Sequence, residues 1–221
     1  MRLTLISDTH GTHPALPSGD VLIHCGDITH FGEFGELKEQ VAWLKSLPFK
    51  HIILVPGNHD VCCETLMNKG MEPALREKLF GKIHYLRDSG VTLEGVRFWG
   101  SPWIPPYAGA FNLDADARVS RWKLIPQGTD VLVTHGPPQG VFDGGAGCEH
   151  LMDAVEDVKP SIHCFGHFHN CGGNQQKIGS TCFLNVAKSP LVLDIPPSAS
   201  RCEHRLSSLE TIGSARGCLQ E

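Results

Sequence analysis

The sequence predicts an α/β protein in which strands alternate with helical crossovers. Short apolar runs recur along the 221 residues, and segments with apolar side chains at helical spacing lie between several of them. Glycine and polar residues follow the runs, as they do at the carboxyl edge of an open α/β sheet. The length fits one large domain that can bury a core without disulfides or structural metals.

The expected elements follow from these patterns in chain order. Helical spacing joins Phe34, Leu37, Val41 and Leu44, and a proline at position 48 ends that pattern. A second helix is expected over 151–158, just before another proline. The expected strands cover residues 3–7, 21–25, 51–55, 96–99, 131–134, 162–165, 181–185 and 191–195.

Two regions fall outside this alternation. Residues 100–128 are irregular and rich in proline and aromatic side chains, which indicates a long insertion of a kind that is often functional. Beyond residue 197 the composition turns to serine, arginine and glutamate with little periodicity. We therefore expect a domain over 1–197 and a C-terminal tail over 198–221 outside its core.

Charge and cysteine content restrict the class of protein. The formal charge of −5 argues against a nucleic-acid polymer as partner, because phosphate neutralisation needs clustered Lys and Arg. Nine cysteines, an odd number with no Cys-x-x-Cys pair, favour a reducing compartment and argue against a zinc ribbon. Neither a membrane-spanning run nor a secretory signal is recognisable. We expect a cytoplasmic protein, and its oligomeric state is left open.

The residues that follow the apolar runs are rich in metal-ligand types. The runs end in Asp8-Thr9-His10, Gly26-Asp27, Gly57-Asn58-His59-Asp60, His135-Gly136 and Gly166-His167-Phe168-His169. Because the carboxyl ends of such strands meet at one edge, carboxylates, an amide and imidazoles should gather there. Glycine before three of these groups allows the sharp turns that a close approach to a ligand needs.

Each fragment alone is weak evidence. An isolated Asp-x-His is more often a surface turn, Gly-Asn-His-Asp can be a turn capped by asparagine, and His135 can be a turn histidine. Gly-His-x-His is stronger, since two histidines two residues apart on an extended segment can reach the same metal. All five fragments stand at expected strand ends, and that conjunction favours a metal site over five unrelated turns.

In this order, the motifs from Asp8 to His169 resemble those of the calcineurin-like metallophosphoesterase superfamily. The residues in and around these motifs are also similar to those of the small metallophosphoesterase-domain proteins of brain and fetal-brain type. That similarity rests on Ile6-Ser7-Asp8-Thr9-His10, His24-Cys25-Gly26-Asp27, Gly100-Ser101-Pro102, Thr134-His135-Gly136-Pro137-Pro138, Asn185 and Asp194-Ile195-Pro196. The resemblance implies a four-layer αββα sandwich with two metal ions at the edge of its sheets.

The resemblance also implies a role for each motif residue. The first metal would be bound by Asp8, His10, Asp27 and His169, and the second by Asp27, Asn58, His135 and His167. Asp27 would bridge both ions, and His59 would be the acid at the leaving group. Asp60, where glutamate is also common, could orient His59. Both histidines of the last motif are present, which favours an active enzyme.

The donor types agree with this assignment independently of the family. Asp, Asn and His offer oxygen and nitrogen without thiolate, a set suited to Mn, Fe, Zn or Mg, and Mn²⁺ is the first candidate. A shared carboxylate holds two ions roughly 3.5–4 Å apart, the spacing used for in-line phosphoryl displacement by metal-activated water. We therefore expect metal-dependent hydrolysis of a phosphate ester.

The substrate is less constrained by the sequence. Trp103 and Tyr107 lie in the insertion and could stack on a base, although a small satellite core beneath a loop is the alternative. Family resemblance points to small phosphodiesters, cyclic nucleotides in particular. The alternatives are a phosphomonoesterase acting on a small metabolite and a non-catalytic metal-binding scaffold of the same fold.

Overall fold

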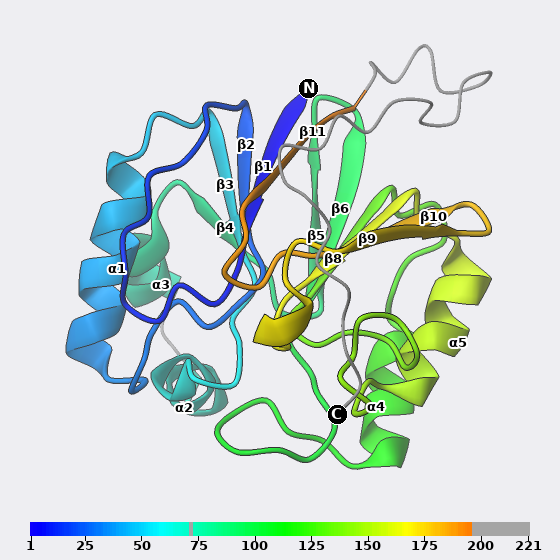
Figure 1. Cartoon of the computed structure of the whole chain (residues 1–221). Coiled ribbons are helices and arrows are strands. Elements are labelled where there is room, and N and C mark those ends of the chain that lie inside the picture. Colours follow the sequence, from blue (N-terminus) through cyan, green and yellow to red (C-terminus); the bar gives the residue numbers. More distant parts are fainter. Residues whose placement is uncertain (71–72, 196–221) are drawn as a thin grey trace.

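The computed structural model describes residues 1–70 and 73–195, so the expected tail over 198–221 lies outside the described residues. Two β-sheets stack face to face, and helices cover the outer face of each (Figure 1). The expected four-layer αββα sandwich is confirmed. Within the described residues, no helix combines the length and apolar character needed to cross a bilayer.

Five strands form the first sheet, in the spatial order β11, β1, β2, β3 and β4. Their bounds are Leu191–Asp194, Arg2–Ile6, Val21–His24, His51–Leu54 and Ile83–Tyr85. The strands β1 to β4 are parallel to their neighbours, and β11 runs antiparallel to β1. Helices α1 (Phe34–Ser46) and α3 (Pro73–Phe80) cover this sheet, and α2 (Val61–Asn68) follows the loop after β3 (Figure 1).

The second sheet has six strands in the order β5, β6, β7, β8, β10 and β9. Their bounds are Ser89–Leu93, Val96–Ser101, Val131–Thr134, Ile162–Phe165, Thr181–Asn185 and Gln175–Ile178. The central strands are parallel, and the edge strands β5 and β9 are antiparallel to their neighbours. Helices α4 (Ala115–Trp122) and α5 (Glu149–Val158) cover its outer face (Figure 1).

Every expected strand is present, with ends shifted by at most two residues. Strands β4, β5 and β9 and helices α2, α3 and α4 were not anticipated. The expectation that residues 100–128 are irregular throughout is wrong, because α4 lies within them. Asp114 begins that helix by accepting a hydrogen bond from the Ala117 amide at 2.8 Å, which is an ordinary N-cap.

Burial explains why the strands form apolar runs. Along β2, Val21 and Ile23 pack into the core between the sheets, whereas Leu22 belongs to the core beneath the helices. A sheet covered on both faces needs apolar side chains at every position of its central strands. The sheets are in close contact at Gly100 on β6, where a Cβ atom would collide with the Leu86 side chain and lie 2.7 Å from the Val55 side chain.

This close contact predicts an overpacking penalty. Gly100→Ala should lower the free energy of unfolding by about 1–3 kcal/mol, because the methyl group forces the two sheets apart. Gly35→Ala is the matched control: nothing lies within 4 Å of the added atom, and alanine is favoured in a helix by roughly 0.5–1 kcal/mol. Urea unfolding measures both, and a Gly100→Ala variant as stable as the parent protein would contradict the packing argument.

A buried histidine lies in the second sheet away from the strand ends. His163 on β8 is fully buried, with its Nε2 2.8 Å from the Thr134 hydroxyl oxygen and the ring of Phe165 at 5.1 Å between centroids. Burial lowers the pKa of His163 to about 3 from an ordinary value of 6.5. The folded protein therefore keeps this imidazole neutral where the unfolded chain protonates it.

Acid should consequently destabilise the fold through His163. The neutral His163 contributes fully to the free energy of unfolding above pH 6.5, and this contribution is lost as the pH falls toward 3. The loss amounts to about 1.4 kcal/mol per pH unit. His163→Gln does not titrate, so its stability should decline less steeply between about pH 6 and pH 4. Urea unfolding at several pH values measures the slope, with His51→Gln, a half-buried histidine of β3, as control. Parallel curves for the parent and His163→Gln would show that this residue is not responsible.

Candidate metal centre

The expected ligands meet where the carboxyl ends of both sheets come together. The loops after β1, β2 and β3 contribute from the first sheet, and the loops after β7 and β8 from the second. Backbone hydrogen bonds join these loops, including Gly166 N to His135 O at 2.8 Å and Asp8 N to Gly26 O at 2.9 Å. Side chains that are far apart in sequence are thereby held at one edge.

One cluster consists of Asp8, His10 and His169. The Nε2 atoms of His10 and His169 lie 3.3 Å apart, and His169 Nε2 lies 3.2 Å from Asp8 Oδ1. One ligand atom from each residue lies within 4.8 Å of the others. Two imidazole nitrogens lie this close to each other and to a buried carboxylate. A cation bound by all three groups would stabilise such an arrangement.

A second cluster consists of Asp27, His135 and His167, again with ligand atoms within 4.8 Å of one another. Asn58 belongs to it, since its Oδ1 lies 2.9 Å from His135 Nε2. Asp27 stands between the two clusters. Its Oδ1 lies 3.3 Å from His135 Nε2, and its Oδ2 lies 3.9 Å from His10 Nε2. All seven residues expected to bind metal are therefore brought together.

The orientation of the second cluster is set by backbone carbonyls. His135 Nδ1 donates to the Cys25 carbonyl oxygen at 2.9 Å, which turns the other ring nitrogen, Nε2, toward Asp27. Asn58 Nδ2 donates to the Ala108 carbonyl oxygen at 3.1 Å, which turns its amide oxygen toward His135. Both residues thus turn the atoms that would bind a metal, His135 Nε2 and Asn58 Oδ1, toward the same space.

The backbone is strained at the same positions. Asp8, His10, Asp27 and His167 all have positive φ values, of 58°, 44°, 56° and 69°. Each such conformation costs on the order of 1–3 kcal/mol in a non-glycine residue and concentrates at functional sites. Gly166 allows the tight approach, because a Cβ atom there would collide with the Ser7 and Asp8 side chains.

Charge in the site is concentrated on two buried carboxylates. Burial alone would raise the pKa of Asp27, but His135 and the His59 amide hold it well below its usual range. Burial would likewise lower the pKa of His135, and the Asp27 charge raises it instead to about 9. Partial burial, together with the positive charge of His135, lowers the pKa of the half-buried His167 to about 4.

These features fit a divalent metal. Within the described residues, the ion-pair partners of Asp8 and Asp27 are histidines alone. Buried anions need a cation or several hydrogen bonds to offset their desolvation. The raised pKa of His135 shows that the site favours a positive charge beside Asp27, and a divalent metal would take the place of that proton. The donor set of oxygen and nitrogen suits Mn, Fe, Zn or Mg.

Asp60 has a different place from the one expected. Its fully buried carboxylate accepts hydrogen bonds from the backbone amides of Asp27, Gly57 and Thr29 at 3.1, 2.7 and 2.9 Å. It therefore fixes the loops after β2 and β3 rather than orienting the ring of His59. That ring is oriented by the His30 carbonyl oxygen, which accepts from His59 Nδ1 at 2.8 Å.

A third group of imidazoles was missed from the sequence. His10, His30 and His59 have nitrogen atoms within 4.8 Å of one another. His30 follows Asp27 by only three residues, but it belongs to no recognisable motif. The exposed ring of Phe31 is 77% accessible and lies at the same mouth of the site.

The two aromatic candidates for substrate contact have different environments. Tyr107 is 62% exposed, and its ring lies 5.0 Å from the His167 ring. Trp103 is buried, and its indole N–H donates to both Asp88 oxygens at 2.9 and 2.8 Å. The environment of Trp103 fits the satellite core that was considered as the alternative, whereas Tyr107 is exposed beside the second cluster.

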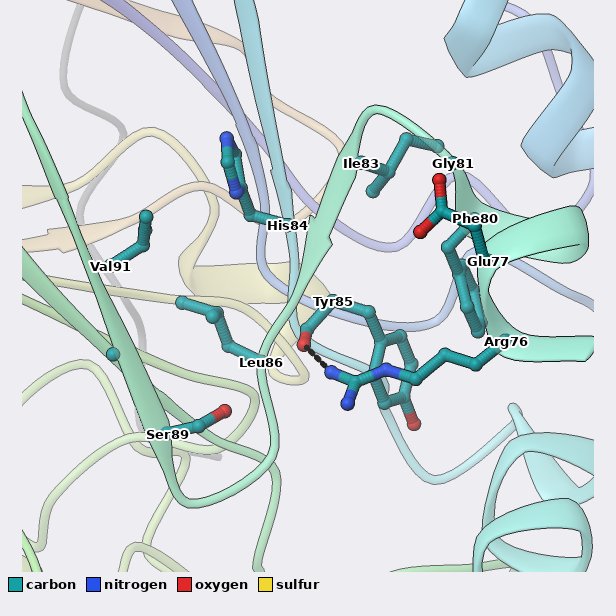
Figure 2. Close-up of a pocket in the computed structure, with 11 residues that line it drawn as sticks. Arg76, Glu77, Phe80, Gly81, Ile83, His84, Tyr85, Leu86, Ser89 and Val91 are labelled. Atoms are coloured by element: carbon teal, nitrogen blue, oxygen red, sulfur yellow. Dashed lines mark hydrogen bonds between the residues drawn. The ribbon is translucent and has the colours of Figure 1, made fainter. Parts of the chain in front are cut away.

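A separate cavity of about 380 Å³ opens between α3, β4 and β5 (Figure 2). Arg76 points along it and donates from Nη2 to the Tyr85 carbonyl oxygen at 3.1 Å. None of the residues that line this cavity belongs to the clusters described above. It is therefore remote from the chemistry that the strand ends support.

Comparison with known proteins agrees with this geometry. The calcineurin-like phosphoesterase family matches residues 1–171. The chain is 35% identical to human metallophosphoesterase domain-containing protein 1 over 235 residues, covering 88% of this chain and 71% of that protein.

Two solved structures are similar in fold. The first is the protein TT1561 of Thermus thermophilus, with a TM-score of 0.62, 14% identity and coverage of 87% of this chain and 93% of that one. The second is phosphopantetheinyl hydrolase from Mycobacterium tuberculosis, with a TM-score of 0.51, 17% identity and coverage of 85% and 90%. Two sheets flanked by helices, motifs in matching order and similarity over most of the chain lead to one conclusion. The chain belongs to the calcineurin-like phosphoesterase family.

Proposed function

We propose that this protein hydrolyses small phosphodiesters with the help of two divalent metal ions. The observation that supports this most directly is the position of Asp27. Its two carboxylate oxygens face histidines of different clusters, His135 at 3.3 Å and His10 at 3.9 Å. One side chain is thus positioned to serve two ions, which is the arrangement used for in-line phosphoryl displacement.

Each cluster supplies the ligands for one ion in this proposal. Asp8, His10, Asp27 and His169 would hold the first, and Asp27, Asn58, His135 and His167 the second. Two such ions, when bound, supply activation of water and neutralisation of the phosphate charge. We propose Mn²⁺ for at least one position, because mixed carboxylate and imidazole donors suit it.

His59 is the proposed proton donor to the leaving oxygen. Its amide donates to Asp27 Oδ1 at 2.8 Å, which places the residue beside the bridging carboxylate. Because Nδ1 is engaged by the His30 carbonyl oxygen, Nε2 is the nitrogen left to carry the proton toward a substrate. Protonation of an alkoxide leaving group by a positioned side chain typically contributes about 10²–10⁴-fold.

A cyclic nucleotide is the proposed kind of substrate. The exposed ring of Tyr107 lies beside His167, on the side of the second ligand cluster, where it can stack on a base. We also propose the cytoplasm as the site of action. In its support, six of the seven cysteines in the described part of the chain are free, all except Cys171.

One assay separates the possible activities. The metal-depleted protein is supplied with Mn²⁺ and tested on bis(p-nitrophenyl) phosphate, on 2′,3′- and 3′,5′-cyclic nucleotides and on p-nitrophenyl phosphate. Turnover of a cyclic nucleotide that EDTA abolishes supports the proposal. Turnover of the monoester alone would replace it with a phosphomonoesterase, and no metal-dependent turnover would leave a binding scaffold.

Asp27→Asn should empty both metal positions while the protein stays folded. The amide removes the charge that both ions share, so metal content should fall from about two ions per chain to well below one. Inductively coupled plasma spectrometry gives the content, and circular dichroism checks the fold. Asp153→Asn, at an exposed aspartate of α5, is the control and should keep both ions. Two tightly held ions in Asp27→Asn would refute the shared-ligand assignment.

His59→Asn should keep both metals and lose activity selectively. A ribose hydroxyl needs a proton to depart, whereas p-nitrophenolate leaves well without one. We expect a loss of about 10²-fold or more on the cyclic nucleotide and a clearly smaller loss on the nitrophenyl diester. His13→Asn, at an exposed histidine, is the control. Equal losses on both substrates would mean that His59 stabilises the phosphate oxygens instead.

A further inference from the structure

The turn at His30 and Phe31 lies beside the proposed proton donor. The His30 carbonyl oxygen accepts from His59 Nδ1 at 2.8 Å, and the two imidazoles are stacked with centroids 6.1 Å apart. A carbonyl can only accept, so Nδ1 keeps its hydrogen in both protonation states, and the second hydrogen of the imidazolium, the one an acid would donate, lies on Nε2. The position of the His30 carbonyl therefore sets the position of the proton that His59 would donate.

Glu36 holds this turn from the first turn of α1. Its Oε1 accepts from the His30 amide at 2.5 Å, and its Oε2 accepts from the Phe31 amide at 3.0 Å. Hydrogen bonds to an ionised carboxylate are stronger than neutral ones, and the two oxygens fix two successive peptide groups. An acidic side chain is also favoured at this end of a helix.

The opposite side of the turn packs against the His59 segment. Gly32 has a φ of 74°, and a Cβ atom there would lie 2.6 Å from the His59 carbonyl oxygen and 2.9 Å from Val61. The Cys62 amide donates to the Gly32 carbonyl oxygen at 3.1 Å. The turn thus lies between Glu36 and the loop that carries His59. A shift of the turn would therefore also move His59.

We infer that Glu36 is a positioning residue for His59, acting through the His30 peptide. This inference rests on the proposed function, because it requires His59 to be the proton donor. Misplacing a reacting group by about 1 Å can cost roughly 10²-fold in rate. Loss of the clamp should therefore impair the reactions that need the proton and spare those that do not.

Three variants test this role. Glu36→Ala removes both acceptors, Glu36→Gln keeps the size and one carbonyl oxygen, and Glu39→Ala changes an exposed glutamate of the same helix. Glu36→Ala should lower kcat on a 2′,3′-cyclic nucleotide by roughly 10–100-fold, with KM nearly unchanged, and lower it less than about threefold on bis(p-nitrophenyl) phosphate. Glu36→Gln should recover part of the loss, and Glu39→Ala should match the parent protein.

A double-mutant cycle with His59→Asn shows whether Glu36 acts through His59. If it does, adding Glu36→Ala to His59→Asn should cause no further loss on the cyclic nucleotide. Additive losses would mean that Glu36 acts independently of His59. The ring nitrogens of ¹⁵N-labelled His59 in the metal-free protein give a readout other than activity. We expect the Nδ1–H tautomer in the parent protein and a mixture of tautomers in Glu36→Ala.

The outcomes distinguish this inference from the proposed function. Suppose that His59→Asn loses more activity on the cyclic nucleotide than on the nitrophenyl diester, whereas Glu36→Ala changes activity equally on both. The positioning role of Glu36 is then overturned, and the assignment of His59 as the acid remains. If His59→Asn shows no selectivity, the acid assignment fails, and the positioning role fails with it. An unchanged His59 tautomer in Glu36→Ala would also overturn the inference. Glu36→Gln keeps the test valid if the alanine variant does not fold.

Discussion

The buried carboxylate of Asp60 is the constraint on which the centre depends. It accepts hydrogen bonds from backbone amides in the loops after β2 and β3, so one planar group sets the spacing of both. Burial and the nearby Asp27 charge raise the pKa of Asp60 to about 6, while these amide donors favour its ionised form. Because Asp60 satisfies the surrounding backbone, the Asp27 oxygens remain directed toward His135 and His10.

The packed sheets hold the strained backbone of the ligand loops in place. Side chains such as Leu5, Ile23 and Val133 are fully buried between the sheets, so the strands cannot slide without opening the core. That core can hold Asp8 and His167 in left-handed backbone conformations which those residues would not adopt alone. The helices on the outer faces also restrict movement of the strands. In addition, α1 provides Glu36, which accepts hydrogen bonds from the His30 and Phe31 amides at the mouth of the site.

Sequence patterns anticipated the strands that are apolar along their whole length and the ligands that follow them. Strand β4 was missed because it has only three residues, and β9 because it spans Gln175–Ile178 with mostly exposed side chains. Asp60 and Glu36 were not assigned their actual contacts, since both bind backbone amides and such bonds leave no signature in residue spacing. His30 likewise contributes a carbonyl oxygen to His59, which any residue type could provide.

The pairing of distant strand ends also bears on how the chain folds. Asp8 and His169 are separated by 161 positions, and His135 and Asn58 by 77. Contacts of such long range form late and slowly, because closing a large loop costs entropy before any contact rewards it. During synthesis strands β1 to β4 of the first sheet can pair first, yet the cluster of Asp8 and His10 stays incomplete until the ribosome has released residue 169. A metal bound by this cluster would therefore be captured late in folding and could not nucleate it.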